Sequence, residues 1–343
     1  MNSKALAYLA FAVLLCSSCL TDEFVEVNDK SPKVVMNAQF ATLANTWKVA
    51  LSKSTVTSLE NMNGVEVWAS VNGGSAEKGT PWDATEQDEW LARYCTEYYF
   101  GTKVNPGDKL SISANTPEGV VSADFDVPTQ INMDSVDTLR TIIHGMYSDD
   151  EYFQFKIKIT DPAETDDYYR LRFYKTEEFV LNGEWVKITT EIRGDGSADP
   201  VITDGQGASS TDLLSELIGG GNDYLVFSDD LFSGETRTIR INFYHYYLSA
   251  SFNHMDPSAE YKPGYVTVVL EHLSFAHYHY YRALQNMETI GYEMTFIFEP
   301  SRVPVNVNGG LGFVGVEAAS EPVTFQIPHD WYDPFIENYY SGD

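Results

Sequence analysis

The sequence is short of basic residues. Lysine and arginine together number 22, whereas aspartate and glutamate number 50, and the formal net charge is −28. Nucleic acids and anionic lipid headgroups are bound through Lys and Arg, so this charge excludes nucleic acid as a partner. The first interpretation of the charge is solubility and mutual repulsion on a crowded surface. Association with divalent cations or with a basic partner is the second.

Long hydrophobic runs are also missing. The apolar run at residues 5–15 is shorter than the about 20 residues that cross a bilayer. It follows Lys4 and leads to the small residues Ser17 and Ser18, as in an export signal with a lipoprotein cleavage site. We expect residues 1–18 to be removed and Cys19 to carry a lipid. The alternative is an ordinary signal peptide cut near Ser18, which would leave Cys19 as a free thiol.

A lipid on Cys19 would fix the mature protein to a membrane surface. Asp22 and Glu23 follow closely, and this acidic pair resembles the signal that sends Bacteroidota lipoproteins to the outer face of the outer membrane. We therefore expect a lipid-anchored, cell-surface protein of the outer membrane, with residues 19–32 as an acidic tether. Removal of residues 1–18 takes away Lys4 and no other charge, so the mature chain carries a formal charge of −29.

Cysteine is scarce, with three residues in the whole chain. Cys16 follows Leu15, which is too large for the residue before a lipoprotein cut, so Cys16 leaves with the signal. Once Cys19 is acylated, Cys95 is alone and no intramolecular disulfide is possible; stability has to come from a buried core. Cys95 stands in an aromatic stretch, and we expect a buried, unreactive side chain.

Motifs of catalysis and metal binding are missing as well. The chain has no Gly-x-Ser-x-Gly elbow and no Ser-x-x-Lys in a convincing setting. His272, His277 and His279 are close in sequence, but they lack the zinc spacing of four with a glutamate between. On a helix, His277 and His279 would point to different sides. We expect no enzyme activity, no catalytic residue, no metal site and no cofactor, and the sequence identifies no ligand-binding residue.

Apolar and aromatic residues are plentiful, at 43% and 14% of the chain, which is enough for a packed core. Short runs of period-two alternation recur from Lys33 onward between Gly, Asn and Pro turns, and predict strands at residues 34–40, 47–52, 65–71, 109–114 and 120–127. Such short strands predict an immunoglobulin-like β-sandwich over residues 33–128, ending at Pro128. The stretch 83–99 fits either a helix or a strand.

The second half, residues 129–343, is predicted to be a second β domain with one packed helix. Its expected strands are residues 153–159, 168–175, 185–192, 224–227, 236–247 and 265–272. Ser274 can cap a helix at residues 274–287, whose apolar stripe includes Phe275 and Tyr278. Residues 193–222, rich in Gly, Ser and Asp, are expected to form a long surface excursion. The fold class is therefore mainly β, with two β-sandwich-like domains.

Four blocks of the C-terminal half carry a family resemblance. They are Asp161-Pro162-Ala163 with Tyr168-Tyr169-Arg170-Leu171; Asp229-Asp230-Leu231-Phe232-Ser233-Gly234; Val266-Thr267-Val268 with Tyr280-Tyr281-Arg282-Ala283-Leu284; and residues 306–315, NVNGGLGFVG. In this order they resemble an uncharacterised Bacteroidota lipoprotein family, the domain of unknown function 4249. The resemblance implies a lipoprotein signal, an N-terminal immunoglobulin-like domain and a second β domain near TonB-dependent transporters. It implies no catalytic residues, and the excursion at 193–222 is longer than the family pattern expects.

The residues of these blocks have structural interpretations of their own. The three glycines in residues 308–312 precede a predicted strand, so they indicate a tight turn or bulge and not a phosphate-binding loop. Asp229-Asp230 indicates a turn more strongly than a calcium site, because no regular ligand spacing surrounds it. Asp195, Asp199 and Asp204 are likewise expected in a solvated loop. The tripeptide Arg193-Gly194-Asp195 arises often by chance.

Tyrosine and tryptophan gather in three clusters. Residues 244–247 and 278–281 are expected in the core, although tyrosine also suits recognition surfaces. Residues 329–343 follow Pro328, are rich in aromatic residues and lack strand periodicity. They fit either an interaction tail or simple packing along the surface of the domain.

Three classes of function remain. The leading hypothesis is a non-catalytic surface lipoprotein, a ligand-binding or accessory subunit. Its expected partners are the membrane, through the lipid on Cys19, and the barrel of a TonB-dependent transporter. The second is a structural or adhesive lipoprotein of a fimbria or matrix. The third is a hydrolase with an unrecognised site. The oligomeric state cannot be inferred from the sequence.

Cys19→Ala should move the protein from the membrane fraction to the soluble fraction, because it removes the acylated thiol. The measurement is fractionation of the expressing cells, and Cys16→Ala is the matched control that should stay membrane-bound. If Cys16→Ala releases the protein and Cys19→Ala does not, the assigned cleavage site is wrong.

Overall fold

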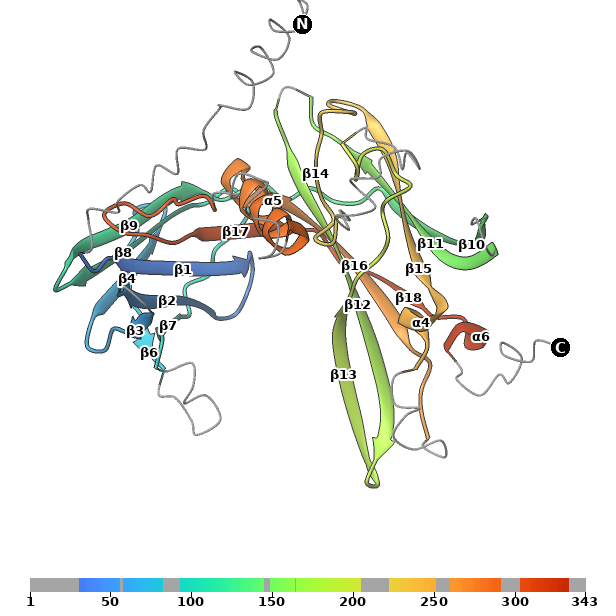
Figure 1. The fold of residues 1–343 in the computed structure, drawn as a ribbon, viewed down its shortest axis with the longest axis horizontal. Coiled ribbons are helices and arrows are strands. Elements are labelled where there is room, and N and C mark those ends of the chain that lie inside the picture. The colour runs from blue at the N-terminus through green and yellow to red at the C-terminus, as the bar shows by residue number, and fades with distance from the viewer. Residues whose placement is uncertain are drawn as a thin grey trace, which may run out of the picture.

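The computed structural model describes residues 31–55, 58–82, 93–144, 149–163, 165–204, 222–250, 260–290 and 303–332. These residues are mainly β, and their strands form two sandwich-like units that lie side by side (Figure 1). The predicted fold class is therefore confirmed: the first sandwich is immunoglobulin-like, and the second carries one packed helix.

The first sandwich packs a four-stranded sheet, β5-β4-β8-β9, against one end of an 11-stranded sheet. Its strands are β1 (Val34–Ala41), β2 (Trp47–Ser54), β3 (Leu59–Asn61), β4 (Glu66–Val71), β5 (Glu77–Lys78), β6 (Thr80–Pro81), β7 (Thr96–Phe100), β8 (Lys109–Thr116) and β9 (Gly119–Asp126). Alternate side chains of both sheets are buried in one core between them. The five strands predicted here are confirmed to within a few residues.

The second sandwich packs the three-stranded sheet β10-β11-β15 against the other end of the large sheet. Its strands are β10 (Ser135–His144), β11 (Asp149–Thr160), β12 (Tyr168–Leu181), β13 (Glu184–Ile192), β14 (Val226–Ser228), β15 (Thr236–Tyr244), β16 (Tyr265–Leu273) and β18 (Val323–Gln326). Phe155 at the centre of this core is fully buried, with its ring 5.3 Å from Phe173 and 5.6 Å from Phe243. Close aromatic packing of this kind makes the core independent of disulfides.

Strand β17 (Val314–Ala319) joins the two sandwiches. It pairs in parallel with β1 and antiparallel with β16, so the large sheet runs without a break from one unit into the other. Val314 and Val316 face the core of the first sandwich, which also takes in Val307. The predicted boundary at Pro128 stays a prediction, but residues far beyond it complete the first core.

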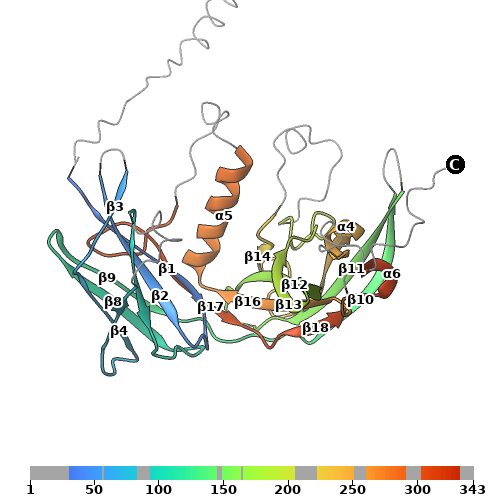
Figure 2. The ribbon, with the colours of Figure 1, turned by 90° about the horizontal axis from the view of Figure 1, so that it is seen from below.

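Helix α5 (Phe275–Ile290) stands between the two sandwiches on one side of the shared sheet, as Figure 2 shows. The predicted cap is confirmed, because the His277 N–H donates to Ser274 Oγ at 3.2 Å. Tyr278 and Tyr281 of α5 are buried, as expected for this tyrosine cluster, whereas Phe275 at the helix start is 61% exposed. Two short helices, α4 (His245–Leu248) and α6 (His329–Tyr332), complete the described helical segments.

The expectations for residues 236–247 need correction. The strand ends at Tyr244, where its pairing with β11 ends, and the chain turns into α4 to bury Leu248. Tyr244, Tyr246 and Tyr247 are 42%, 76% and 41% exposed and do not belong to the core. Strand β10 was not predicted, because polar residues occupy both of its faces and hide the alternation.

The described part of the excursion, residues 193–204, is not wholly on the surface. Val201 and Ile202 belong to the second core, and Asp199 is 1% exposed. The Asp199 carboxylate accepts the backbone N–H groups of Val201 and Arg240, at 3.0 and 2.9 Å. This aspartate therefore holds the excursion against β15 instead of standing in solvent.

None of the helices in the described ranges has the length and apolar composition needed to cross a bilayer.

Gly315→Ala should destabilise the protein by about 1–3 kcal/mol, because a Cβ at this position would lie 2.7 Å from His277 Nδ1 and push α5 away from β17. The measurement is the free energy of unfolding in urea. Gly101→Ala is the control: its Cβ would meet nothing closer than Glu77 Oε1 at 3.7 Å. Equal effects of the two substitutions would contradict the tight contact between α5 and β17.

Candidate functional site

Three buried aspartates meet at one end of the second sandwich. Asp161 follows β11, Asp167 precedes β12, and Asp229 follows β14. One carboxylate oxygen of each lies within 4.8 Å of an oxygen of the other two, and the residues are 3%, 5% and 2% exposed. In the described part of the chain this is the group of ligand-type side chains that is close enough to hold a metal ion.

Hydrogen bonds fix two of the three carboxylates. Asp161 accepts from the Tyr169 hydroxyl at 2.5 Å and from the Gly234 N–H at 2.9 Å. Asp167 accepts from the Thr165 hydroxyl at 2.7 Å. These donors hold the oxygens of Asp161 and Asp167 in place before any ligand arrives.

His272 of β16 stands beside this cluster. Its Nδ1 lies 2.7 Å from the Thr129 carbonyl oxygen, which can only accept, so Nδ1 carries the proton. Its Nε2 then faces Asp167 Oδ1 at 2.9 Å. The imidazole therefore supports Asp167 and bridges the segment after the first sandwich to the cluster.

The third carboxylate, that of Asp229, lies in surroundings that disfavour its charged form. Burial, followed by the nearby carboxylates of Asp161 and Asp167, raises the pKa of Asp229 above its ordinary value, although hydrogen bonds from the Asp167 backbone and the Ser233 side chain act in the opposite direction. Asp229 Oδ2 is buried and accepts no hydrogen bond within the described residues. Burial and the hydrogen bond to Asp161 also raise the pKa of the Tyr169 hydroxyl, so the phenol stays protonated as a donor.

A second buried charge cluster lies under α5. Arg172 donates to Glu191 through Nε at 3.1 Å and through an Nη at 2.5 Å, and to Glu271 at 3.2 Å. Arg170 lies 3.2 Å from Glu191 and 3.6 Å from Glu271. Glu271 is 2% exposed, so arginines and not water surround its carboxyl group.

Helix α5 and β17 close this ionic cluster. Arg170 donates to the Tyr281 hydroxyl at 2.9 Å, and that hydroxyl donates to Glu317 of β17 at 2.7 Å. The Arg170 guanidinium also lies 4.5 Å from the centre of the Tyr281 ring. His277, stacked on Tyr281, is fully buried, and burial lowers its pKa to about 4. The imidazole is therefore neutral at pH 7.

The ionic cluster holds two arginines and the three carboxylates of Glu191, Glu271 and Glu317. Burial, followed by the Glu317 charge, raises the pKa of Glu271 to about 8. Burial alone would raise the pKa of Glu191. Hydrogen bonds and charge from Arg172 outweigh this effect, and the pKa of Glu191 lies below its ordinary value. Two positive and three negative groups thus approach neutrality when Glu271 is protonated. The cluster links β12 and β16 to α5 and β17, and its side chains include no nucleophile. We interpret its role as structural.

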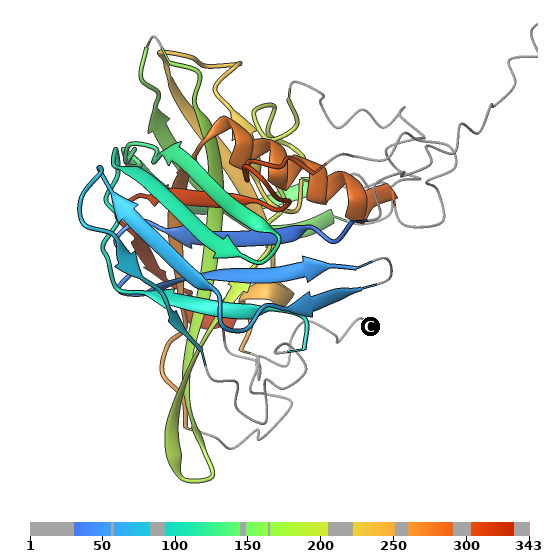
Figure 3. The ribbon, with the colours of Figure 1, turned by 90° about the vertical axis from the view of Figure 1, so that its left-hand side faces the viewer.

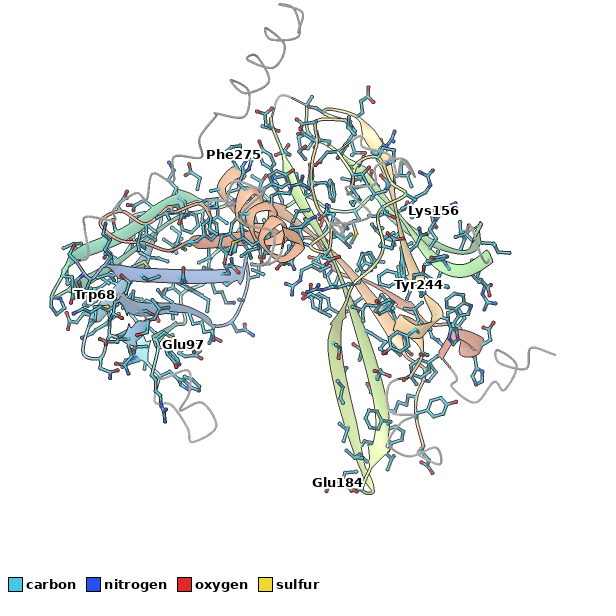
Figure 4. The ribbon with its side chains drawn as sticks, viewed as in Figure 1. Trp68, Glu97, Lys156, Glu184, Tyr244 and Phe275 are labelled. Carbon is cyan, nitrogen blue, oxygen red and sulfur yellow. The ribbon has the colours of Figure 1, made fainter. Side chains whose placement is uncertain are left out.

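The β12–β13 hairpin extends well past the body of the protein. Its outer half, residues 177–188, is called the arm here, and Figures 1 and 3 show it projecting below both sandwiches, with Glu184 at the tip in Figure 4. Asn182 and Gly183 make the turn with φ of 53° and 83°, as expected for a two-residue hairpin. Trp185 and Ile188 of the arm are 52% and 40% exposed.

The described residues line two hollows of a size near that of a small-ligand site. One of about 290 Å³ lies between the first sandwich and α5, lined by Gln39, Lys48, Tyr280 and Phe313 among others. The other, of about 270 Å³, is lined by residues around Tyr261 and Tyr332. Both volumes are at the lower end of the range for small-molecule sites.

The other residues singled out in the sequence do not come together. His272, His277 and His279 lie in three different settings, because His279 is exposed on the far side of α5 from His277. Asp195 accepts from the Ser197 N–H, and Asp204 pairs with Arg282 at 2.8 Å, so neither joins Asp199 in a site. Cys19, residues 205–221 and residues 333–343 lie outside the described residues.

The glycine turn and the Asp229 turn are confirmed. Gly309 and Gly312 have φ of 75° and 107°, and a Cβ on Gly312 would lie 2.1 Å from the Met36 carbonyl oxygen. The backbone at Gly312 therefore lies against β1, just before β17 begins, at a place where a side chain does not fit. The Phe232 N–H closes the other turn on the Asp229 carbonyl at 2.7 Å.

Sequence reasoning missed the meeting of Asp161, Asp167 and Asp229. Two of the blocks that carry the family resemblance contain Asp161 and Asp229, and Asp167 directly precedes one of them. The position of all three aspartates in or beside these blocks was the sequence feature that could have indicated the cluster. Sequence spacing could not reveal the cluster, because its three members come from segments that only the sheet brings together.

Taken together, the described residues define a two-sandwich β protein with a projecting arm and a buried carboxylate cluster. The family model of a domain of unknown function, DUF4249, matches residues 21–321, and the chain belongs to this family. No curated protein matches the sequence. A DUF4785 family protein from Legionella pneumophila is a solved structure with some similarity, at 10% identity and a TM-score of 0.22, over 70% of this chain and 52% of that one. The match spans about half of that protein, and so low a TM-score carries no argument.

The free energy of unfolding should fall as the pH rises from about 4.5 towards 8, because folded Glu271 keeps a proton that the unfolded chain releases. Glu271→Gln should flatten this slope, since glutamine cannot ionise. The measurement is urea unfolding at several pH values. Glu191→Gln is the control that should keep the slope, because the pKa of Glu191 is lowered and not raised. An unchanged slope in Glu271→Gln would refute the raised pKa of Glu271.

Proposed function

We propose that the protein is a non-catalytic, lipid-anchored accessory protein of the outer membrane that binds a protein partner through the arm. The lipid on Cys19 restricts its partners to those at a membrane surface. The family resemblance favours the barrel of a TonB-dependent transporter as the partner. The observation that carries the proposal is the outer part of the arm, because Leu181, Trp185 and Ile188 are exposed there and belong to neither core, whereas Phe179 at the base of the arm packs into the second core.

The arm combines three features of a protein-binding element. Trp185 and Ile188 project from opposite faces of the hairpin, because their partners in the β12 register are Val180 and Glu177. Exposed tryptophan is enriched at the centres of protein interfaces, where it contributes more than most residues. The exposed Leu181 before the turn extends the apolar surface to the tip.

The backbone of the arm adds a third feature. Strand β13 is the terminal strand of the large sheet, and no described residue pairs with its outer edge. The opposite edge, on β12, is covered by residues 260–262, since the Lys262 N–H donates to the Glu178 carbonyl. An unpaired edge flanked by apolar side chains suits addition of a strand from a partner.

Charges near the arm limit what it can bind. Lys262 lies 4.7 Å from the centre of the Trp185 ring and pairs with Glu178 at 2.5 Å, and Lys187 pairs with the same glutamate at 3.6 Å. The arm thus carries both signs of charge within a strongly acidic protein. The two lysines offset part of the acidic charge at this place, so the arm repels an acidic protein surface less than the rest of the molecule does.

The test is an affinity pull-down of the tagged, full-length lipoprotein from native outer membranes in mild detergent. The double variant Trp185→Ala/Ile188→Ser should lose a partner that the wild type retains, by about 2 kcal/mol or about 30-fold in affinity. Val120→Ser is the matched control, because Val120 is 62% exposed on a strand of the other sandwich. Cys19→Ala tests the part played by the anchor.

Each outcome bears on the proposal. Loss of a stoichiometric barrel protein in the arm variant alone supports it, and equal recovery in all variants contradicts it. Recovery of only further copies of this chain would favour the structural or adhesive alternative, in which two β13 edges pair. A hydrolytic activity that survives in the arm variant would contradict the non-catalytic part.

A further inference from the structure

The carboxylate cluster of Asp161, Asp167 and Asp229 carries an inference independent of the arm. Clusters of acidic side chains are common on a protein with 50 acidic residues, but those are solvated. These three are each at least 95% buried, where a carboxylate costs several kcal/mol unless it is compensated. The compensation within the described residues is incomplete.

Asp229 shows the deficit most directly. Its Oδ2 is buried, and no described group donates a hydrogen bond to it. The residue belongs to the cluster, and the charges of both Asp161 and Asp167 act on its carboxyl. His272 lies beside the cluster with its Nε2 2.9 Å from Asp167 Oδ1, and no described Lys or Arg forms an ion pair with the three aspartates. Negative charge therefore exceeds positive charge in the cluster.

The backbone holds the three segments in this arrangement. The Asp229 N–H donates to the Asp167 carbonyl at 3.0 Å, and the Asp161 N–H donates to the Glu235 carbonyl at 3.1 Å. The Gly234 N–H returns to Asp161 Oδ2, so the turn after β14 is bound to the end of β11. Backbone geometry and side-chain donors thus preorganise the oxygens, as in a site built for a ligand.

We propose that Asp161, Asp167 and Asp229 bind one divalent cation through their carboxylate oxygens, and that the cation is Ca²⁺. The donors that gather are oxygens alone, which suits a hard cation and disfavours zinc or copper. A cation engages the unpartnered Asp229 Oδ2 and balances the excess negative charge. Tyr169, Thr165 and His272 orient the ligands from behind.

The bound ion would join three segments of the second sandwich that are distant in sequence. It fixes the end of β11, the start of β12 and the turn after β14 at one point. Binding to the folded state alone raises stability by linkage, and a cross-link of three segments acts at the entry to β12, the strand that continues into the arm.

The experiment uses the purified mature protein, freed of metal with a chelator, and compares its thermal unfolding with and without Ca²⁺ at matched ionic strength. Ca²⁺ should raise the melting temperature of the wild type by several degrees, and Mg²⁺ should do so less. Asp229→Asn should abolish the Ca²⁺ effect and weaken Ca²⁺ binding at least about tenfold. Asp230→Asn is the matched control: Asp230 is the exposed neighbour and bonds to Ser228.

Equal Ca²⁺ responses in Asp229→Asn and Asp230→Asn would overturn the site and leave surface association only. Identical melting of the wild type with Ca²⁺ and with chelator, together with no saturable binding, would also overturn it. A stronger response to Mg²⁺ or Zn²⁺ would reject the assignment to calcium.

A direct titration covers the case in which Asp229→Asn does not fold. Tb³⁺ replaces Ca²⁺ in oxygen sites and emits when a nearby tyrosine is excited, and the Tyr169 hydroxyl bonds directly to Asp161. The wild type should bind one equivalent of Tb³⁺ with sensitised emission that Ca²⁺ displaces, and Tyr169→Phe should lose most of that emission. Emission unchanged in Tyr169→Phe would place the ion elsewhere and overturn the proposal.

Discussion

The parallel pairing of β17 with β1 is the interaction on which the arrangement of the two sandwiches depends. Alternate residues of β17 contact different neighbours. Val314 and Val316 fill the first core, while Gly315 and Glu317 face α5. Parallel neighbours need a long connection, and here that connection contains most of the second sandwich, β10 to β16. The chain returns to the second sandwich with β18 after β17, so the two units are interleaved in sequence, and α5 is packed where they meet.

Two charge clusters lie on either side of the region where the two sandwiches meet, and their negative charges are compensated in different ways. Under α5, two arginines face three carboxylates, and a proton on Glu271 brings the group close to neutrality. Around Asp229, three carboxylates face one histidine, and no described Lys or Arg pairs with them. Each cluster has one buried carboxylate oxygen without a described donor, Glu271 Oε2 and Asp229 Oδ2, but arginine charge compensates the first cluster, whereas the second calls for a ligand.

Much of the fold could be predicted from the sequence, because alternation along a strand records which face is buried. The runs that became β8 and β11 show this, and so does the Ser274 cap of α5. The tyrosines after β15 could not be predicted, since aromatic residues in a core and at a rim have the same pattern. The carboxylate cluster was hidden for another reason: its members are brought together by strand pairing, and pairing partners leave no mark in local sequence.

The link between β1 and β17 also has a consequence for how the chain folds. The Phe313 N–H donates to the Asn37 side chain across 276 residues of sequence. During synthesis β1 is made early, yet its parallel neighbour emerges only after β10 to β16 of the second sandwich. Until then one edge of the first sandwich stays unpaired, and its core lacks Val314 and Val316. Such a high contact order favours slow folding, in which the N-terminal unit is completed only when the C-terminal part of the chain is available.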